Sequence, residues 1–291
     1  LKDASPVVLL ALGDDEQKNS QSVKRLSEQG YRLYEYVPGP QVLAPHDEHD
    51  LRDPYLMNLI ALKKDREEAL KQAGWVHDES VEPEAPEPGL WKQALGGLPW
   101  TASVIDEWNQ TPEIGWRKEY LRALDYLCAA EQLDLSDSAN TPRRSEKAAL
   151  MLQGAGLLIS LYNSGRTSLP IALTLVRVLH ALGKRGQAVD ILKEVMESSE
   201  LGQQANGMDL PFLPPLSEQD EAPIHTDFAK WLIVRITEAW ILVKDVTTYL
   251  SGERERKLLE ALEGNLECTD LIIKKFKLRK EIIKSTAKTR S

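Results

Sequence analysis

The stretch that decides the fold of the first part of the chain is GYRLYEYVPG, residues 30–39. Gly30 is a typical helix end, and SQSVKRLSEQ before it carries apolar residues at helix spacing. YRLYEYV is aromatic and β-prone and runs into a Pro-Gly turn, so it predicts a strand. On either side of this stretch, PVVLLAL (6–12) predicts a buried strand and QVLAP (41–45) predicts a returning strand. The expected order is strand, helix, strand, turn, strand.

The rest of the chain predicts a different architecture. Residues 53–76, DPYLMNLIALKKDREEALKQAGWV, indicate a connecting segment and a helix that ends at Gly74. VHDESVEPEAPEPG (76–89) is acidic and proline-rich, which is typical of an extended linker. Beyond about Leu98 the apolar spacing is helical, with Gly and Pro between segments. We therefore expect a mostly α protein: a short α/β segment at 1–75, an acidic Pro-rich linker at 76–97 and an all-α helical-hairpin domain at 98–291.

Composition excludes several classes of function. The 291 residues are 42% hydrophobic and carry a formal net charge of -9. Nucleic-acid binders usually present a basic surface, so no nucleic-acid partner is expected. Cys128 and Cys268 form no disulfide framework in a chain of this length, which favours a reducing compartment. No membrane span and no signal peptide are recognisable. We therefore expect a cytoplasmic protein.

One helical hairpin has a repeat-like pattern. IALTLVRVLHALGKRGQAVDILKEVME (171–197) resembles a single tetratricopeptide-type unit, with Gly183 at the turn and Ala188 allowing close helix approach. A self-sufficient array usually needs at least about three such units. A bundle of helical hairpins is therefore expected rather than a tetratricopeptide superhelix.

The opening stretch is part of a longer set of motifs. These are Gly30-Tyr31-x-Leu33-Tyr34, then Pro38-Gly39, then Asp53-Pro54-Tyr55 with Asn58-Leu59. With these motifs, residues 5–76 resemble the C-terminal part of FkbM-family methyltransferases, which are class I enzymes that use S-adenosylmethionine. The resemblance implies the end of a doubly wound sheet in a bacterial protein. It also implies methyl transfer to a hydroxyl of a sugar or glycan, in which positioning of the acceptor oxygen supplies much of the rate.

The same resemblance leaves the cofactor site outside this chain. The Gly-rich loop and the acidic residue that hold such a cofactor belong to the first half of the domain. We therefore expect the parent protein to bind S-adenosylmethionine and this chain alone to bind none, and the catalytic residues are unknown. Family members carry an acidic residue near the end of the strand that matches residues 6–12, whereas here Asp14 and Asp15 come later.

Several interpretations of this segment stay open. They are a catalytic half encoded upstream, a degenerate domain kept as a scaffold, and a coincidental likeness. The alternative function is a non-enzymatic, helical-repeat-like adaptor or scaffold protein.

Aromatic residues are the candidate contacts for a substrate or partner. Trp91, Trp100, Trp108 and Trp116 recur at intervals of nine, eight and eight. They suit a platform for a sugar ring or a peptide, or alternatively side chains that pack the linker against both domains. The predicted contacts are Tyr34, Tyr36, Trp100, Trp108 and Trp116. The helical domain is expected to recruit a glycan acceptor or a protein partner.

Two charged segments complete the candidates. HDEHD (46–50) gathers five metal-ligand types in one loop, but a solvated loop is the simpler interpretation, so no metal is expected. The tail from Lys274 to Arg290 has eight basic residues and one acid, Glu281. Its apolar positions make it amphipathic, so it can make weak contact with an anionic membrane surface or fit a partner's groove. A terminal helix packed by one face, with its cations near its C-terminal end, is the more common case.

Overall fold

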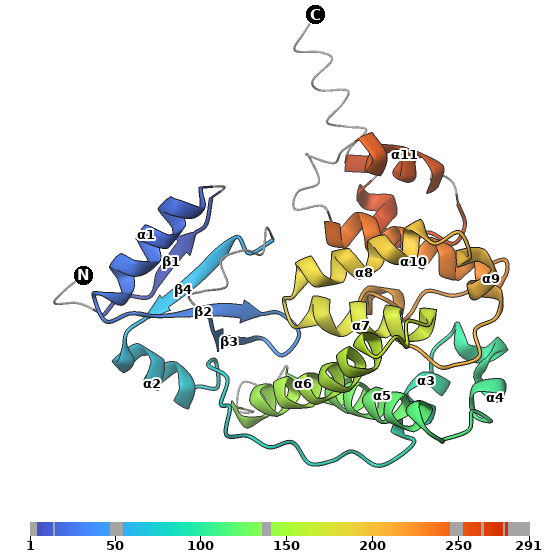
Figure 1. The fold of residues 1–291 in the computed structure, drawn as a ribbon, viewed down its shortest axis with the longest axis horizontal. Coiled ribbons are helices and arrows are strands. Elements are labelled where there is room, and N and C mark those ends of the chain that lie inside the picture. The colour runs from blue at the N-terminus through green and yellow to red at the C-terminus, as the bar shows by residue number, and fades with distance from the viewer. Residues whose placement is uncertain are drawn as a thin grey trace, which may run out of the picture. The chain divides into compact units, whose positions relative to one another are not determined.

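The computed structural model describes residues 5–13, 15–46, 55–135, 141–244, 253–262, 265–275 and 277–278. The protein is mostly helical, at 57% helix, with a small N-terminal four-stranded antiparallel sheet followed by a helical region (Figure 1). This confirms the expected fold class. Within the described ranges, no helix combines the length and the apolar character that crossing a membrane requires.

The chain divides into two compact units. The first comprises Leu1–Leu90, Arg122–Leu157 and Ala181–Gly186, and the second Trp91–Leu121, Leu158–His180 and Gln187–Ser291. The domain boundaries predicted from the sequence stay a prediction.

The sheet lies in the first unit and has the strand order β1-β4-β2-β3. Its strands are β1 (Val8–Ala11), β2 (Arg32–Val37), β3 (Val42–Pro45) and β4 (Asn58–Leu62). β4 pairs antiparallel with both β1 and β2, with Ile60 opposite Leu9 on one side and Tyr34 on the other. β1 and β2 therefore run in the same direction. They are joined by helix α1 (Glu16–Ser27), which begins where the Asp15 carboxylate accepts the Lys18 N–H at 3.1 Å.

Both faces of the sheet bury apolar side chains, because successive residues of a strand point to opposite faces. Helix α1 lies over one face of the sheet (Figure 1). The buried cluster of that face comprises Val23, Leu26, Tyr31, Leu33, Leu59 and Ala61. The other face carries a second cluster, against which Leu70 of α2 (Lys64–Gln72) packs; its members are Tyr34, Leu43, Leu62 and Val76. The sheet is thus the middle layer between two helices.

Strand β4 differs from the sequence-based expectation, which placed a connecting segment and one helix at 53–76. NLIAL forms the strand, and the helix is confined to α2. The difference arises because a short apolar run looks the same in a strand buried on both faces as in a buried helix. The predicted end of this helix at Gly74 is confirmed by its left-handed φ of 72°.

The β2–β3 turn is fixed against helical parts of the first unit. The Gly39 N–H donates to the Ala181 carbonyl at 2.8 Å. A Cβ on Gly39 would lie 2.9 Å from the Ala181 Cβ and 3.0 Å from the Met151 Cε. Only glycine fits this approach without displacing its neighbours.

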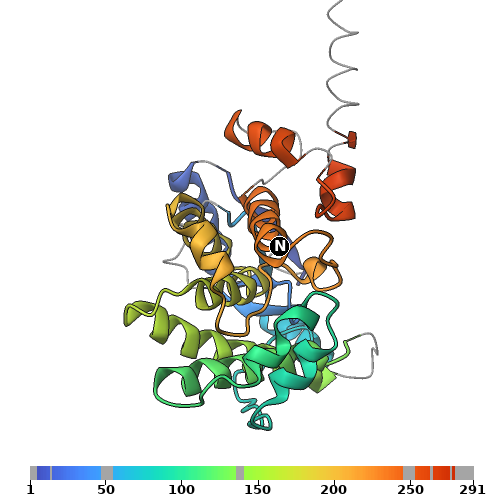
Figure 2. The same ribbon diagram turned by 90° about the vertical axis from the view of Figure 1, so that its right-hand side faces the viewer.

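Helices make up the rest of the described chain. The hairpin expected at 171–197 turns at Gly183, whose φ is 76°, and Ala188 is fully buried, while its likeness to a tetratricopeptide unit stays a prediction. In the second unit, α9 and α11 pack against the largely buried α10 (Figures 1 and 2). The helices are α3 (Leu90–Gly96), α4 (Ile105–Trp108), α5 (Trp116–Gln132), α6 (Thr141–Asn163), α7 (Leu169–Ala181), α8 (Arg185–Glu197), α9 (Leu201–Asn206), α10 (Phe228–Lys244) and α11 (Glu253–Leu262).

Candidate functional site

A charged cluster lies on the β2–β3 hairpin of the first unit. The His46 Nδ1 contacts one oxygen of the Glu35 carboxylate, and the Lys184 Nζ lies 3.5 Å from the other. The His46 ring is buried, and its Nε2 has no hydrogen-bond partner among the residues that the structure describes. Burial raises the pKa of Glu35, but His46 and Lys184 outweigh it and hold that pKa below its usual range.

This cluster joins three segments of one unit. Glu35 belongs to β2, His46 follows β3, and Lys184 lies in the turn between α7 and α8. A carboxylate–imidazole pair is a common general-base arrangement, but a base needs its outer nitrogen within reach of a substrate. Because the Nε2 of His46 is closed off from solvent, the geometry favours positioning of the hairpin over proton transfer.

The two predicted tyrosine contacts are placed differently. Tyr34 is fully buried in the sheet, and burial raises the pKa of its hydroxyl. Tyr36 is 51% exposed. Of the two, Tyr36 has the surface that a contact requires, and its role stays a prediction.

Trp100 and Trp108 belong to an aromatic cluster in the second unit. The Trp100 ring stacks on Trp231 with centroids 5.0 Å apart, and Trp108 meets it edge-on at 5.9 Å. Phe212 and Phe228 complete the cluster. Both predicted tryptophans are fully buried, which favours the packing alternative for them. Their periodic spacing gave no sign of the three aromatic partners, which come from more than 100 residues later in the chain.

Trp116 has a different environment. It is partly buried, and the guanidinium carbons of Arg117 and Arg166 each lie 5.7 Å from its ring centroid. Arg117 also forms an ion pair with Asp209 at 2.8 Å. The indole is thus held by cations, which interact favourably with an aromatic face. Contact of Trp116 with a substrate or partner stays a prediction.

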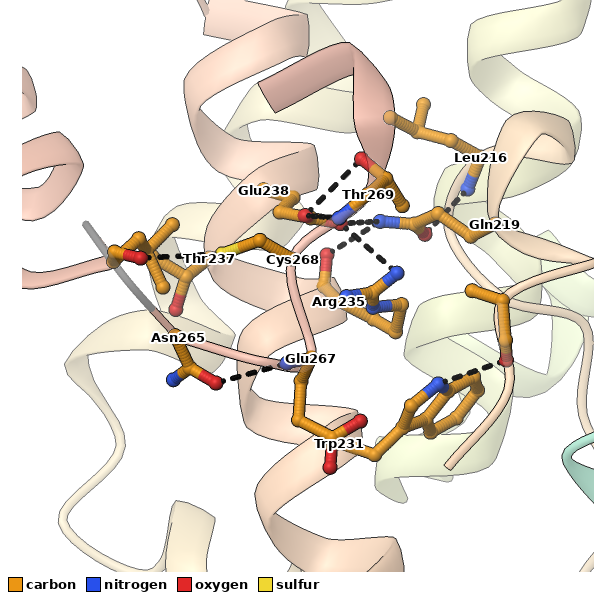
Figure 3. Close-up of polar contacts among 12 residues, drawn as sticks. Leu216, Gln219, Trp231, Arg235, Thr237, Glu238, Asn265, Glu267, Cys268 and Thr269 are labelled. Atoms are coloured by element: carbon orange, nitrogen blue, oxygen red, sulfur yellow. Dashed lines mark hydrogen bonds and ion pairs between the residues drawn. The ribbon is translucent and has the colours of Figure 1, made fainter. Parts of the chain in front are cut away.

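A buried polar network on α10, shown in Figure 3, was not predicted from the sequence. Arg235 and Glu238 are both 0% exposed and lie 3.3 Å apart. The Glu238 carboxylate also accepts the Thr269 N–H at 2.7 Å and the Gln219 Nε2–H at 3.3 Å. The sequence signal for this network is the presence of two charged residues inside the apolar run WLIVRITEAWILV. Charged side chains are seldom fully buried unless they are paired, so this pattern indicates a buried ion pair.

A second carboxylate, that of Glu267, also links α10 with the C-terminal segment. Here the carboxylate lies in the C-terminal segment, and its donors lie beside α10. Glu267 accepts the Thr226 N–H at 2.6 Å and the Thr226 hydroxyl at 2.7 Å, just before α10 begins. Glu238 in turn accepts the Thr269 N–H at the start of the helical segment that follows. Each carboxylate therefore satisfies N–H groups at a helix beginning.

The network has little capacity for chemistry. Burial raises the pKa of Glu238, although Arg235 and Thr269 oppose it. Burial also raises the pKa of the Cys268 thiol to about 11, with the charge of Glu238 adding to the effect. A thiol with a raised pKa is a poor nucleophile at neutral pH. The arrangement is that of a buried link between α10 and the C-terminal segment.

Some sequence-based candidates lie outside the described residues. These are Asp47 to Asp50 of the HDEHD loop, Asp53 and Pro54 of the family motif, and most of the basic tail, residues 276 and 279–291. In the described part of the chain, no three His, Cys, Asp or Glu side chains are grouped so as to hold a metal ion.

Comparisons of the chain with protein-family models, with curated proteins and with solved structures find no match.

Proposed function

We propose that this chain is the C-terminal portion of an FkbM-like, S-adenosylmethionine-dependent O-methyltransferase that acts on a sugar or glycan hydroxyl in the bacterial cytoplasm. The strand order and strand directions of the sheet are the main support for this proposal. β1 and β2 run in the same direction, are joined by α1 and flank the antiparallel β4. The resemblance expects a strand, a helix and an antiparallel strand pair at this point of a doubly wound sheet.

The outer edge of β1, which pairs with no further strand among the described residues, gives further support. β1 is the end strand of the sheet, and Val7 and Leu9 are 55% and 68% exposed. Native proteins usually pair, cover or charge an apolar edge of this kind. In the proposal, strands of a cofactor-binding half continue the sheet beyond β1.

In the proposal, the cofactor site lies in the first half of the domain and not in this chain. A nucleotide-binding turn needs closely spaced glycines so that backbone can approach the ligand. After β1 the chain offers a single glycine, Gly13, before α1 begins. No catalytic step is therefore assigned to this chain, whose role in the proposal is to close the sheet and to present the helical region to an acceptor or a partner.

The test begins with the coding sequence upstream of Leu1. It should encode a strand followed by a Gly-rich loop and, after the next strand, an acidic residue. A protein extended to include them should bind S-adenosylmethionine in calorimetry, and the present chain should not. Absence of these motifs upstream, or binding by the present chain, would contradict the proposal.

The α7–α8 hairpin supports a second candidate, a non-enzymatic helical adaptor. Its turn at Gly183 and the complete burial of Ala188 are what closely packed helical-repeat units require. An extended protein that binds neither S-adenosylmethionine nor its demethylated product would favour this candidate.

The proposal includes weak contact of the basic C-terminal segment with an anionic membrane surface. Lys274 and Lys277 are exposed, and Leu271 and Leu278 are 41% and 40% exposed. Sedimentation with phosphatidylglycerol vesicles should show salt-sensitive binding that vesicles of phosphatidylcholine alone do not give.

A further inference from the structure

The helical segment at residues 270–275 and 277–278 is fixed to the second unit by one of its sides. Ile272, on that side, is 0% exposed. Just before the segment, the Thr269 N–H and the Thr269 hydroxyl donate to the Glu238 carboxylate of α10 at 2.7 and 3.1 Å (Figure 3). The segment therefore has a fixed orientation on its unit, and its opposite side faces solvent.

The solvent side of this segment combines apolar and basic side chains. Leu271 and Leu278 are 41% and 40% exposed. Lys274 and Lys277 are exposed as well. Residues three, four and seven positions apart share one face of a helix, so Leu271, Lys274 and Leu278 form a single strip. Lys277 borders that strip, because it lies three positions from Lys274.

The charge of this part of the sequence selects an anionic partner. From Lys274 to Arg290 there are eight basic residues and one acid, Glu281, in a chain whose formal net charge is -9. A lysine close to an anionic surface is attracted to it, and the attraction falls off within a Debye length. The partner that complements this segment is therefore negatively charged.

The exposed leucines distinguish between classes of anionic partner. A nucleic acid that is bound without sequence preference is held mainly through its phosphate charges. The interface of a bilayer also takes up apolar side chains, so an amphipathic helix gains from both kinds of residue. Leu271 and Leu278 beside the two lysines therefore favour a bilayer that contains anionic lipid.

We propose that the solvent side of this segment is a docking face for an anionic bilayer. Leu271 and Leu278 enter the boundary between headgroups and acyl chains, and Lys274 and Lys277 contact lipid phosphates. Because the opposite side of the segment is fixed to α10, docking holds the second unit at the membrane in one orientation. The inference rests on the membrane contact proposed above and names the residues and the lipid class that make it.

Sedimentation of the whole chain with phosphatidylglycerol vesicles tests this face through two pairs of substitutions. Lys274→Gln with Lys277→Gln should weaken binding about thirtyfold, since each lysine at such a surface contributes about fivefold. Leu271→Gln with Leu278→Gln should weaken binding about tenfold, through the loss of buried apolar area. The matched controls are Lys118→Gln on α5 and Leu152→Gln on α6, which replace an exposed lysine and an exposed leucine and should leave binding unchanged.

Different outcomes separate this inference from the proposal on which it rests. If the wild type binds the vesicles and the leucine pair binds equally well, the docking face is wrong and a purely electrostatic contact remains. If the wild type does not bind, both the face and the membrane contact are wrong, while the upstream-sequence test of the methyltransferase is unaffected. Displacement of the vesicles by single-stranded DNA that the leucine pair binds as tightly as the wild type would identify a nucleic-acid partner instead. Circular dichroism checks that each variant is folded.

Discussion

Arg235 and Glu238 lie one turn apart on α10, 3.3 Å from each other and both fully buried. Neither charge is exposed to solvent, so each depends on the other and on the polar groups around it. The Glu238 carboxylate has additional donors in Thr269 and Gln219. The stability of the second unit is therefore sensitive to the balance of charge at this point.

Glu238→Gln should destabilise the protein by about 3–5 kcal/mol, because it leaves the Arg235 charge buried without an anion. Urea unfolding followed by circular dichroism measures the change. The double variant Arg235→Met with Glu238→Gln should lose less than Glu238→Gln alone, since no uncompensated charge remains. Glu221→Gln, at an exposed position, is the matched control and should change stability little. Equal losses for the single and double variants would contradict this account.

The free energy of unfolding should depend on pH through Glu35, and the partners of this carboxylate fix the sign of that dependence. Its folded-state pKa lies below the ordinary value of 4.5, because His46 and Lys184 outweigh burial. Its contribution to stability is therefore fully present above pH 4.5 and is lost as pH falls through the folded-state pKa. Glu35→Gln should cost about 2 kcal/mol at pH 7 and less at pH 3. Unfolding by urea at the two pH values measures this, with the exposed Glu28→Gln as control. A cost that does not shrink at pH 3 would rule out the ion pairs as its source.

Gly39→Ala should destabilise the first unit by about 1–3 kcal/mol, because the new methyl group would overlap Ala181. Gly13→Ala is the matched control, since a Cβ there meets nothing within 4 Å. Thermal melts of the two variants compare them directly. If both variants melt at the wild-type temperature, the turn does not pack as closely as described.

The fold class could be predicted from the sequence because its signals are local. GYRLYEYVPG combines a helix end, a β-prone run and a turn within ten residues, and all three are present in the structure. Strand β4 could not be predicted, because NLIAL becomes a strand only through pairing with β1 and β2 on its two sides. Local propensity gives no information on such non-local pairing.

The candidate sites were less predictable for the same reason. The spacing of Trp100 and Trp108 indicates aromatic side chains, but their burial depends on Phe212, Phe228 and Trp231. The charged cluster on the β2–β3 hairpin draws Glu35 and Lys184 from positions 149 residues apart in the sequence. Nothing in either local pattern brings them together.

The aromatic cluster of the second unit offers a comparison between two tryptophans. Trp100 is fully buried and stacks on Trp231, so Trp100→Ala should cost about 3–5 kcal/mol through lost packing and the cavity left behind. Trp116 is only partly buried, and Trp116→Ala should cost clearly less. Urea unfolding followed by far-ultraviolet circular dichroism measures both without relying on tryptophan fluorescence. A larger loss at Trp116 than at Trp100 would mean that the five-ring cluster is not the aromatic core of this unit.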